Sequence, residues 1–253
     1  MPQNTPKSET FNMDCLEYMK GCEDRQFSLL FTDPPFGDAG TGEYTNRDTG
    51  RFGPMFEKYH SDLKPVTKVN HASGGNAFKK YGDECLHWDV APSEEWWNEA
   101  WRIAEHIWVW GGNYFDLPPS RNFIIWLKPV AENFSLAQME YCWISTPGNA
   151  RIIHARSQDK FRFHPTQKPM AAFQKPLQWM RKHIDPTRGM IDPFMGSGTS
   201  RIAAWEEDIN YVGIELNAVY FQKQEARFAE HIAKGSLYDT TAITTIESEE
   251  GLF

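Results

Sequence analysis

The chain has 253 residues, of which 40% are hydrophobic, and a formal net charge of −8 at pH 7. This length and composition suit one globular domain, so residues 1–253 are predicted to form a single domain. No apolar run could span a membrane and the N-terminus has no hydrophobic signal core, so we expect a cytoplasmic protein without a membrane partner. The four cysteines form no C-x-x-C pair, and no metal is expected.

The first predicted elements are a short strand at residues 11–12, a helix from about residue 14 to residue 20, and an apolar strand over Phe27–Thr32. A polar, glycine-punctuated stretch without clear periodicity then covers residues 38–88. A segment of this length without regular structure inside a compact domain is usually functional. We interpret it as a functional insertion in preference to a mobile surface loop.

A helix is predicted to begin at Ser93, whose hydroxyl can accept from the free N–H groups of the first turn. Trp97 and Trp101 are four residues apart on this helix, and we expect them to pack in the core rather than to stack on bases. A strand at residues 106–110 follows, and Gly111 and Gly112 allow a sharp turn at its end.

Two further strands are predicted over residues 123–127 and 139–145. The second is expected to be an antiparallel edge strand, because residues 128–138 are too few for a crossover helix. The remaining pattern predicts a helix over residues 170–183, then a strand followed by a glycine loop over residues 190–200 and a short helix over residues 201–206. A strand at residues 210–215, a long helix at 217–233 and a poorly ordered tail at 235–253 complete the predicted chain. Strands that alternate with helices predict an α/β fold with a mostly parallel sheet covered on both faces.

The most informative motif is Asp33-Pro34-Pro35-Phe36, directly after the apolar strand. The two prolines fix the backbone, so the carbonyl of Pro34 is presented with little freedom to turn away. A carboxylate and a carbonyl can together accept both hydrogens of a planar amino group, and an aromatic ring can stack on the base that carries it. The motif therefore indicates a catalytic loop for the exocyclic amine of a nucleobase.

A second candidate site lies in the segment from Met190 to Ser200, which contains Gly196 and Gly198. These glycines let the backbone approach a bound molecule closely, and Thr199 or Ser200 can cap the helix that follows. The strand after that helix ends at Glu215, about where nucleoside-binding βαβ units place a carboxylate that holds ribose hydroxyls. No lysine follows the glycines, so a phosphate cradle is disfavoured.

The acidic net charge counts against a nucleic-acid partner, because DNA affinity rests largely on Lys and Arg contacts to phosphates. Two local basic groups answer this objection. The first includes Lys64, Lys68, His71, Lys79 and Lys80, and a solvated face is an equally good explanation for it. The second, for which a functional role is favoured, comprises Arg151, His154, Arg156, Lys160, Arg162, His164 and Lys168.

These motifs resemble those of the S-adenosylmethionine-dependent DNA amino-methyltransferases of the β class, including phage-type adenine-N6 enzymes, in which the Asp-Pro-Pro-aromatic motif precedes the glycine loop. Phe163-His164-Pro165-Thr166-Gln167-Lys168-Pro169 is similar to the family segment that helps to hold the methionine part of the cofactor. Asn12-Met13-Asp14-Cys15-Leu16 resembles the segment that meets the adenine of the cofactor. The resemblance runs from about residue 10 to about residue 230 and is weakest between residues 38 and 88, the stretch that we interpret as a DNA-facing, target-recognition insertion.

The resemblance implies a Rossmann-like methyltransferase fold with a circularly permuted motif order, S-adenosylmethionine as cofactor and double-stranded DNA as partner. It implies catalytic roles for Asp33, Pro34, Pro35 and Phe36. It implies cofactor-binding roles for Asp14, Cys15, Asp33, His164, Pro165, Thr166, Asp192, Phe194, Gly196, Ser197, Gly198, Thr199, Glu215, Leu216 and Asn217. Whether the protein is a homodimer, and whether a restriction enzyme accompanies it, stays open.

The expected reaction is methylation of the N6 amine of an adenine flipped out of the duplex, because members with Asp before Pro-Pro mostly act there. Cytosine-N4 methylation is the alternative, since Phe36 replaces the commoner Tyr. Methylation of RNA or of protein amides is disfavoured by Asp33 and by the motif order. A catalytically silent DNA-binding module and a plain nucleotide-binding α/β protein are the remaining alternatives.

Overall fold

The computed structural model describes residues 5–36, 90–129, 137–156 and 162–239, and of residues 235–239 only the backbone. The predicted insertion at residues 38–88 and the part of the predicted tail after residue 239 lie outside the described residues. One sheet of eight strands, in the order β1-β8-β7-β2-β3-β5-β4-β6, organises the described chain. The strands are β1 (Ser8–Phe11), β2 (Phe27–Thr32), β3 (Ala104–Trp110), β4 (Phe123–Leu127), β5 (Met139–Ile144), β6 (Arg151–His154), β7 (Met190–Asp192) and β8 (Tyr211–Ile214).

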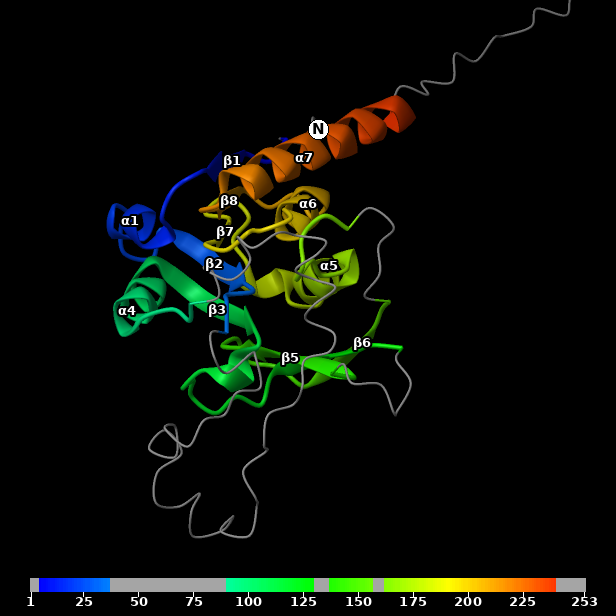
Figure 1. The fold of residues 1–253 in the computed structure, drawn as a ribbon. Helices are drawn as coiled ribbons and strands as arrows, with labels where there is room; N and C mark the ends of the chain where they lie inside the picture. The colour runs from blue at the N-terminus through cyan, green and yellow to red at the C-terminus, as the bar shows by residue number, and fades with distance from the viewer. Residues whose placement is uncertain (1–4, 37–89, 130–136, 157–161, 240–253) are drawn as a thin grey trace, which may run out of the picture.

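Helices cover both faces of this sheet, which confirms the predicted α/β architecture (Figure 1). They are α1 (Cys15–Lys20), α4 (Glu94–Ile103), α5 (Met170–Trp179), α6 (Thr199–Glu206) and α7 (Ala218–Asp239), with 3-10 turns at Gly112–Tyr114 and Arg181–His183. Leu29 and Phe31 of β2 pack in a cluster with α5 and α6, whereas Leu30 packs in a second cluster with α1 and α4. The alternation of side chains along β2 therefore joins the two cores.

The neighbouring strands pair in parallel except at β5, which is antiparallel to both β3 and β4. The predicted antiparallel direction of β5 is thus confirmed, but its predicted edge position is wrong. The chain returns from β4 to insert β5 between β3 and β4, and β6 then pairs in parallel with β4 at the edge. The strand β6 was not predicted, because its four residues Arg151–His154 were interpreted only as part of a basic group.

The helix α4 begins as predicted, with the Ser93 hydroxyl accepting from the Trp96 N–H at 3.2 Å. The prediction that Trp101 packs in the core is wrong, because 43% of Trp101 is exposed. The buried face of α4 is formed by Trp96, Ala100 and Ile103, while Trp97 packs at its border. The helix is therefore rotated by about one residue from the orientation that we predicted.

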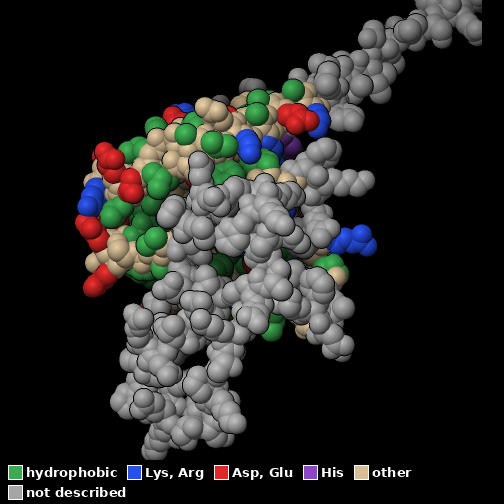
Figure 2. Space-filling model, viewed as in Figure 1, with side chains coloured by type: hydrophobic (Ala, Val, Ile, Leu, Met, Phe, Trp, Pro, Cys, Tyr) green, Lys and Arg blue, Asp and Glu red, His purple; other side chains and the backbone are tan. Residues whose placement is uncertain are grey.

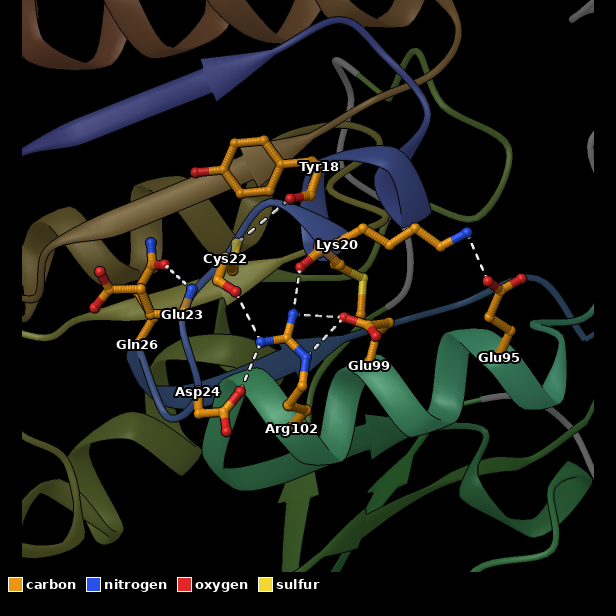
Figure 3. A network of polar contacts seen from close by, with 10 residues as sticks. Tyr18, Lys20, Cys22, Glu23, Asp24, Gln26, Glu95, Glu99 and Arg102 are labelled. Atoms are coloured by element: carbon orange, nitrogen blue, oxygen red, sulfur yellow. Dashed lines mark hydrogen bonds and ion pairs between the residues drawn. The ribbon is translucent and has the colours of Figure 1, made fainter.

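Charged side chains of both signs gather over α1 and α4, at the left of Figure 2. Arg102 is the centre of the polar contacts between these two helices (Figure 3). Its guanidinium donates to the carbonyls of Met19 and Cys22 at 2.9 and 2.7 Å, and to the carboxylates of Glu99 and Asp24 at 2.6 and 2.8 Å. It therefore ties α4 to the chain at the end of α1: the Met19 carbonyl accepts from Arg102 as well as from the Cys22 N–H, and the Cys22 carbonyl accepts from Arg102 just after the helix.

Replacing Arg102 by Lys is expected to lower the free energy of unfolding by about 1–3 kcal/mol, because an ammonium cannot reproduce the planar array of donors. Urea denaturation followed by circular dichroism measures the change. The matched control is Arg121→Lys at an exposed position, which is expected to leave the unfolding midpoint unchanged. An Arg102→Lys midpoint equal to that of the control would contradict the role given to these contacts.

Candidate active site

The two motifs singled out in the sequence meet at one edge of the sheet. Strands β2 and β7 are parallel neighbours, with Leu29 opposite Met190 and Leu30 opposite Ile191. The carboxyl ends of both strands therefore lie side by side, and each carries a loop that begins with an acid, Asp33 or Asp192. A ligand between the carboxyl ends of parallel strands can contact both loops.

Asp192 ties these two loops together. Its Oδ1 accepts from the hydroxyl of Thr32 at 2.7 Å and from the N–H of Phe194 at 3.1 Å, and its Oδ2 accepts from the hydroxyl of Ser200 at 2.5 Å. The residue is buried, and burial raises the pKa of its carboxyl to about 6, although the three donors oppose this. A cofactor-binding role for Asp192 stays a prediction; what the contacts establish is a brace between β2 and the glycine loop.

The glycine loop adopts a backbone that requires its glycines. Gly196 and Gly198 have φ values of +49° and +72°, where other residues are strained. A Cβ on Gly196 would lie 3.3 Å from two ring atoms of the buried His164, so the His-Pro-Thr segment lies directly against this loop. Burial, Arg162 and Lys168 lower the pKa of His164 to about 3, so its imidazole is neutral.

The expected capping of the following helix by Thr199 or Ser200 is wrong. Gly198 is the N-cap of α6 and provides no side chain, because its left-handed backbone starts the helix at Thr199. The two hydroxyls lie inside the first turn instead. That of Ser200 donates to Asp192, and that of Thr199 lies 3.1 Å from the hydroxyl of Ser197.

Glu215 lies at the glycine loop, as the sequence predicted. Its Oε2 accepts from the N–H of Gly196 at 3.0 Å, and its Oε1 accepts from the N–H of Asn217 at 2.8 Å. Burial raises the pKa of Glu215 to about 7, against the lowering effect of these two N–H donors. The carboxylate is therefore held at a fixed place beside the loop, with lone pairs left for further donors.

The predicted segment near the N-terminus is held at the same end of the sheet. The side-chain amide of Asn12 donates to the carbonyls of Glu215 and Leu216, at 2.7 and 3.0 Å. Asp14 is the N-cap of α1, where its carboxylate accepts from the N–H groups of Leu16 and Glu17. A direct contact of Asp14 or of Cys15 with a cofactor stays a prediction.

Asp33 is largely buried, and its two oxygens differ. Oδ2 accepts from the ammonium of Lys168 at 2.5 Å, whereas Oδ1 is buried and has no hydrogen-bond partner among the described residues. Burial raises the pKa of Asp33 to about 6; Lys168 opposes this shift and Glu140 adds to it. An unpartnered buried oxygen costs free energy unless a ligand donates to it, so Oδ1 is a candidate acceptor for a substrate N–H.

The interpretation of Lys168 and His164 as members of a DNA-facing basic group is wrong, because Lys168 and His164 are buried, with 6% and 8% of each residue exposed. Lys168 also pairs with Glu140 at 2.9 Å, and Glu140 pairs with Lys128 at 2.5 Å. Glu140 and Lys128 were not predicted as site residues. The one sequence feature that could have indicated them is their position: Lys128 directly follows β4, and Glu140 lies at the start of β5.

Phe36 lies on an aromatic platform that was also missed. Its ring stacks on that of Tyr114, with the ring centroids 4.6 Å apart and the planes inclined by 26°. It also covers Gly111, where a Cβ would lie 2.1 Å from the nearest ring carbon. The Gly-Gly-Asn-Tyr sequence after β3 thus provides the surface on which the last residue of the Asp-Pro-Pro-Phe motif rests.

A mostly parallel sheet that places a glycine loop and the Asp-Pro-Pro-Phe loop on adjacent strand ends is the arrangement of a Rossmann-like methyltransferase. The chain belongs to the N6_N4_Mtase family of DNA methylases, whose model matches residues 88–226. DNA is therefore its substrate and S-adenosylmethionine its cofactor. None of the described helices combines the length and apolar composition needed to cross a membrane.

Individual relatives are distant. The Type II methyltransferase M2.MboI of Moraxella bovis is 23% identical over 259 residues, which cover 86% of each chain. The structure of the M1.HpyAVI–SAM complex is 18% identical, with a TM-score of 0.45, over 87% of this chain and 98% of that one. The PvuII DNA methyltransferase, described as cytosine-N4-specific, is 16% identical with a TM-score of 0.48, over 88% of this chain and 87% of that one.

Proposed function

We propose that the protein methylates the N6 amine of an adenine that is flipped out of double-stranded DNA. The observation that carries this proposal is the buried, unpartnered Oδ1 of Asp33, at the strand end next to the glycine loop. An exocyclic amine offers two hydrogens, one for this oxygen and one for the carbonyl of Pro34. Pro34 and Pro35 restrict the backbone, so the carbonyl keeps its direction.

The residues act mainly by positioning. The lone pair of a base amine is delocalised into the ring, so the amine is a poor nucleophile until its hydrogens are drawn out of the ring plane. Asp33 and the Pro34 carbonyl provide these acceptors, and holding two reactants in attack geometry contributes roughly 7–11 kcal/mol. Bound S-adenosylmethionine provides an electrophilic sulfonium methyl group. The nitrogen then loses a proton, for which the carboxylate of Asp33 is the nearest acceptor.

Phe36 is proposed to stack on the flipped base. Its ring is fixed from behind by Tyr114 and Gly111, so the stacking surface is in place before the base arrives. Extrusion of a base costs a few kcal/mol, and stacking on an aromatic ring returns about 1–3 kcal/mol.

The cofactor is proposed to lie along the glycine loop, with its ribose hydroxyls donating to Glu215. The residues of this structure suit such a ligand: the left-handed glycines allow close approach, and neutral His164 closes the loop from one side. The full set of proposed cofactor residues is Asp14, Cys15, Asp33, His164, Pro165, Thr166, Asp192, Phe194, Gly196, Ser197, Gly198, Thr199, Glu215, Leu216 and Asn217.

Affinity for S-adenosylmethionine is expected to rise with pH through about 7, the pKa of Glu215 in the free protein. Below this pH the carboxyl is protonated, accepts more weakly from the ribose hydroxyls and does not offset the sulfonium charge. Isothermal titration calorimetry from pH 5.5 to 7.5 should show a Kd that falls by about tenfold, the equivalent of roughly 1.4 kcal/mol. Glu215→Gln is expected to bind more weakly and without this dependence; a wild-type Kd that is flat over the range would contradict the assignment.

The base is identified by incubating the protein with duplex DNA and tritiated cofactor, followed by chromatography of the nucleosides. N6-methyladenine is the expected product. N4-methylcytosine would support the alternative. Cofactor and DNA binding without any transfer would identify a catalytically silent module. The similarity to the Type II methyltransferase M2.MboI favours a role in restriction–modification. Whether the protein forms a homodimer is tested by light scattering.

A further inference from the structure

The side chains of Lys128, Glu140, Lys168 and Asp33 form a charge network, in which positive and negative groups alternate and which ends at the proposed catalytic carboxylate of Asp33. Lys128 lies 2.5 Å from Glu140 Oε1, Lys168 lies 2.9 Å from Glu140 Oε2, and the same Lys168 ammonium lies 2.5 Å from Asp33 Oδ2. The four residues come from the ends of β4, β5 and β2 and from the segment before α5. Three separate parts of the described chain are therefore linked to Oδ2 of Asp33, of which only Lys168 contacts it directly.

The charge network has a role beyond stabilising the fold. Its side chains are between 5% and 25% exposed, and burial of that degree imposes a desolvation cost that well-packed apolar residues would avoid. The ammonium of Lys168 also lies 5.6 Å from the centroid of the Trp110 ring, and Trp110 belongs to the hydrophobic core. Oδ2 of Asp33 accepts from Lys168, and Oδ1 has no hydrogen-bond partner among the described residues. The charge network therefore fixes the carboxylate with Oδ1 available to a ligand.

We propose that Lys168 and Glu140 are positioning residues for methyl transfer. Lys168 holds Oδ2 so that Oδ1 faces the amine, and Glu140 divides the ammonium between two carboxylates so that Asp33 stays basic enough to take a proton. This inference rests on the proposed function, since it assumes that Asp33 accepts from the base amine.

The proton balance supports this division of charge. As the N–C bond forms, the C–S bond of the cofactor breaks and its electron pair stays on sulfur; the nitrogen then releases one proton to Asp33. Lys168 keeps its own protons: burial acts to lower the pKa of its ammonium, but Asp33 and Glu140 outweigh burial and raise the pKa above the ordinary value. Glu140 remains ionised, because Lys168 and Lys128 overcome the effect of burial and lower its pKa to about 2.

Five groups of the described residues interact electrostatically with Asp33 and so affect its pKa. They are Lys168, Glu140 and Lys128 of the charge network, Asp192 on β7, and the thiol of Cys142 on β5. Removing the positive charge of Lys168 should raise the pKa of Asp33, whereas removing the negative charge of Glu140 should lower it. The two changes thus act in opposite directions on the same carboxyl group.

The test compares Lys168→Gln and Glu140→Gln with exposed controls, Lys175→Gln and Glu94→Gln. Single-turnover rates are measured from pH 5 to 9 with saturating cofactor. For Lys168→Gln the acid limb of the profile should move up by about 1–3 units, and for Glu140→Gln it should move down. At pH 7 Lys168→Gln should lose about 10²-fold in kcat with a nearly unchanged KM for DNA, since positioning errors of this kind act on the chemical step.

A second readout is independent of activity. The pKa of Asp33 is followed by NMR of protein labelled at the aspartate carboxyl carbons, with Asp33→Asn for assignment, and should shift in the same opposite directions. Lys128→Gln, at the outer end, should give a smaller upward shift and serves if Lys168→Gln does not fold. Equal or parallel shifts in the two variants would overturn the proposal. If the wild type transfers no methyl group, the proposed function fails. The NMR shifts still decide whether the charge network sets the pKa of Asp33.

Discussion

Replacing Asp33 by Asn is expected to lower the rate of methyl transfer by about 10²–10⁴-fold, the usual contribution of a positioned proton acceptor. The isosteric amide keeps the shape of the side chain. Lys168 donates at 2.5 Å in the wild type and will take the single amide oxygen, which turns the NH₂ group toward the substrate amine. Two donors then face each other, so both the acceptor and the base for the proton are lost.

Single-turnover transfer of tritiated methyl groups to DNA measures this loss, and calorimetry with S-adenosylmethionine shows whether the cofactor site survives. We expect the Kd of the cofactor to change by less than about threefold, a difference below roughly 0.7 kcal/mol. Asp116→Asn, at an exposed position after Tyr114, is the control. An Asp33→Asn enzyme that works at the wild-type rate would remove Asp33 from the mechanism.

Gly111→Ala is expected to damage the site through Phe36. A Cβ at this position would lie 2.1, 2.4 and 2.9 Å from three carbons of the Phe36 ring, and the φ of +70° is itself unfavourable for alanine. The ring must leave its place on Tyr114, and a displacement of about 1 Å can cost roughly 10²-fold in rate. Left-handed strain and overpacking add a loss of about 2–5 kcal/mol in the free energy of unfolding.

A double variant separates these effects. In a Phe36→Ala background the added methyl group no longer meets a ring, so Gly111→Ala should then have little further effect on the rate. Gly21→Ala, where a Cβ would lie 3.4 Å from its nearest neighbour and φ is −82°, is the matched control for a glycine substitution. If the rates of the two single variants multiply in the double variant, the ring contact does not explain the result.

The strands of the parallel sheet could be predicted because local sequence determines them. Phe27–Thr32, Phe123–Leu127 and Met190–Asp192 are apolar runs with a turn signal on at least one side, and buried strands read in this way. Glycine loops and strand-end acids were equally visible. The contact between Gly196 and Glu215 confirms that this second pair of features lies at one place.

The features that were missed depend on long-range packing. Lys168 reads as a basic residue among basic neighbours, and only the approach of Asp33 and Glu140, 135 and 28 positions away in sequence, converts it into a buried partner. The place of β5 could not be predicted because strand order depends on how the loops cross the sheet. Trp101 was misplaced because a rotation of about one residue is too small for the spacing of tryptophans to determine.

The pairing of β1 with β8 affects how the protein folds during synthesis. Among the described strands, β1 pairs with β8 alone, some 200 residues later, and β2 obtains one of its neighbours from β7. Contacts of such wide separation form slowly, because the intervening chain must be closed into a loop first. During synthesis the contact between the glycine loop and Glu215, where we propose that the cofactor binds, therefore cannot form until residues beyond Glu215 have left the ribosome. A ribosome stalled before that point would carry a nascent chain that already contains Asp33 but does not bind the cofactor.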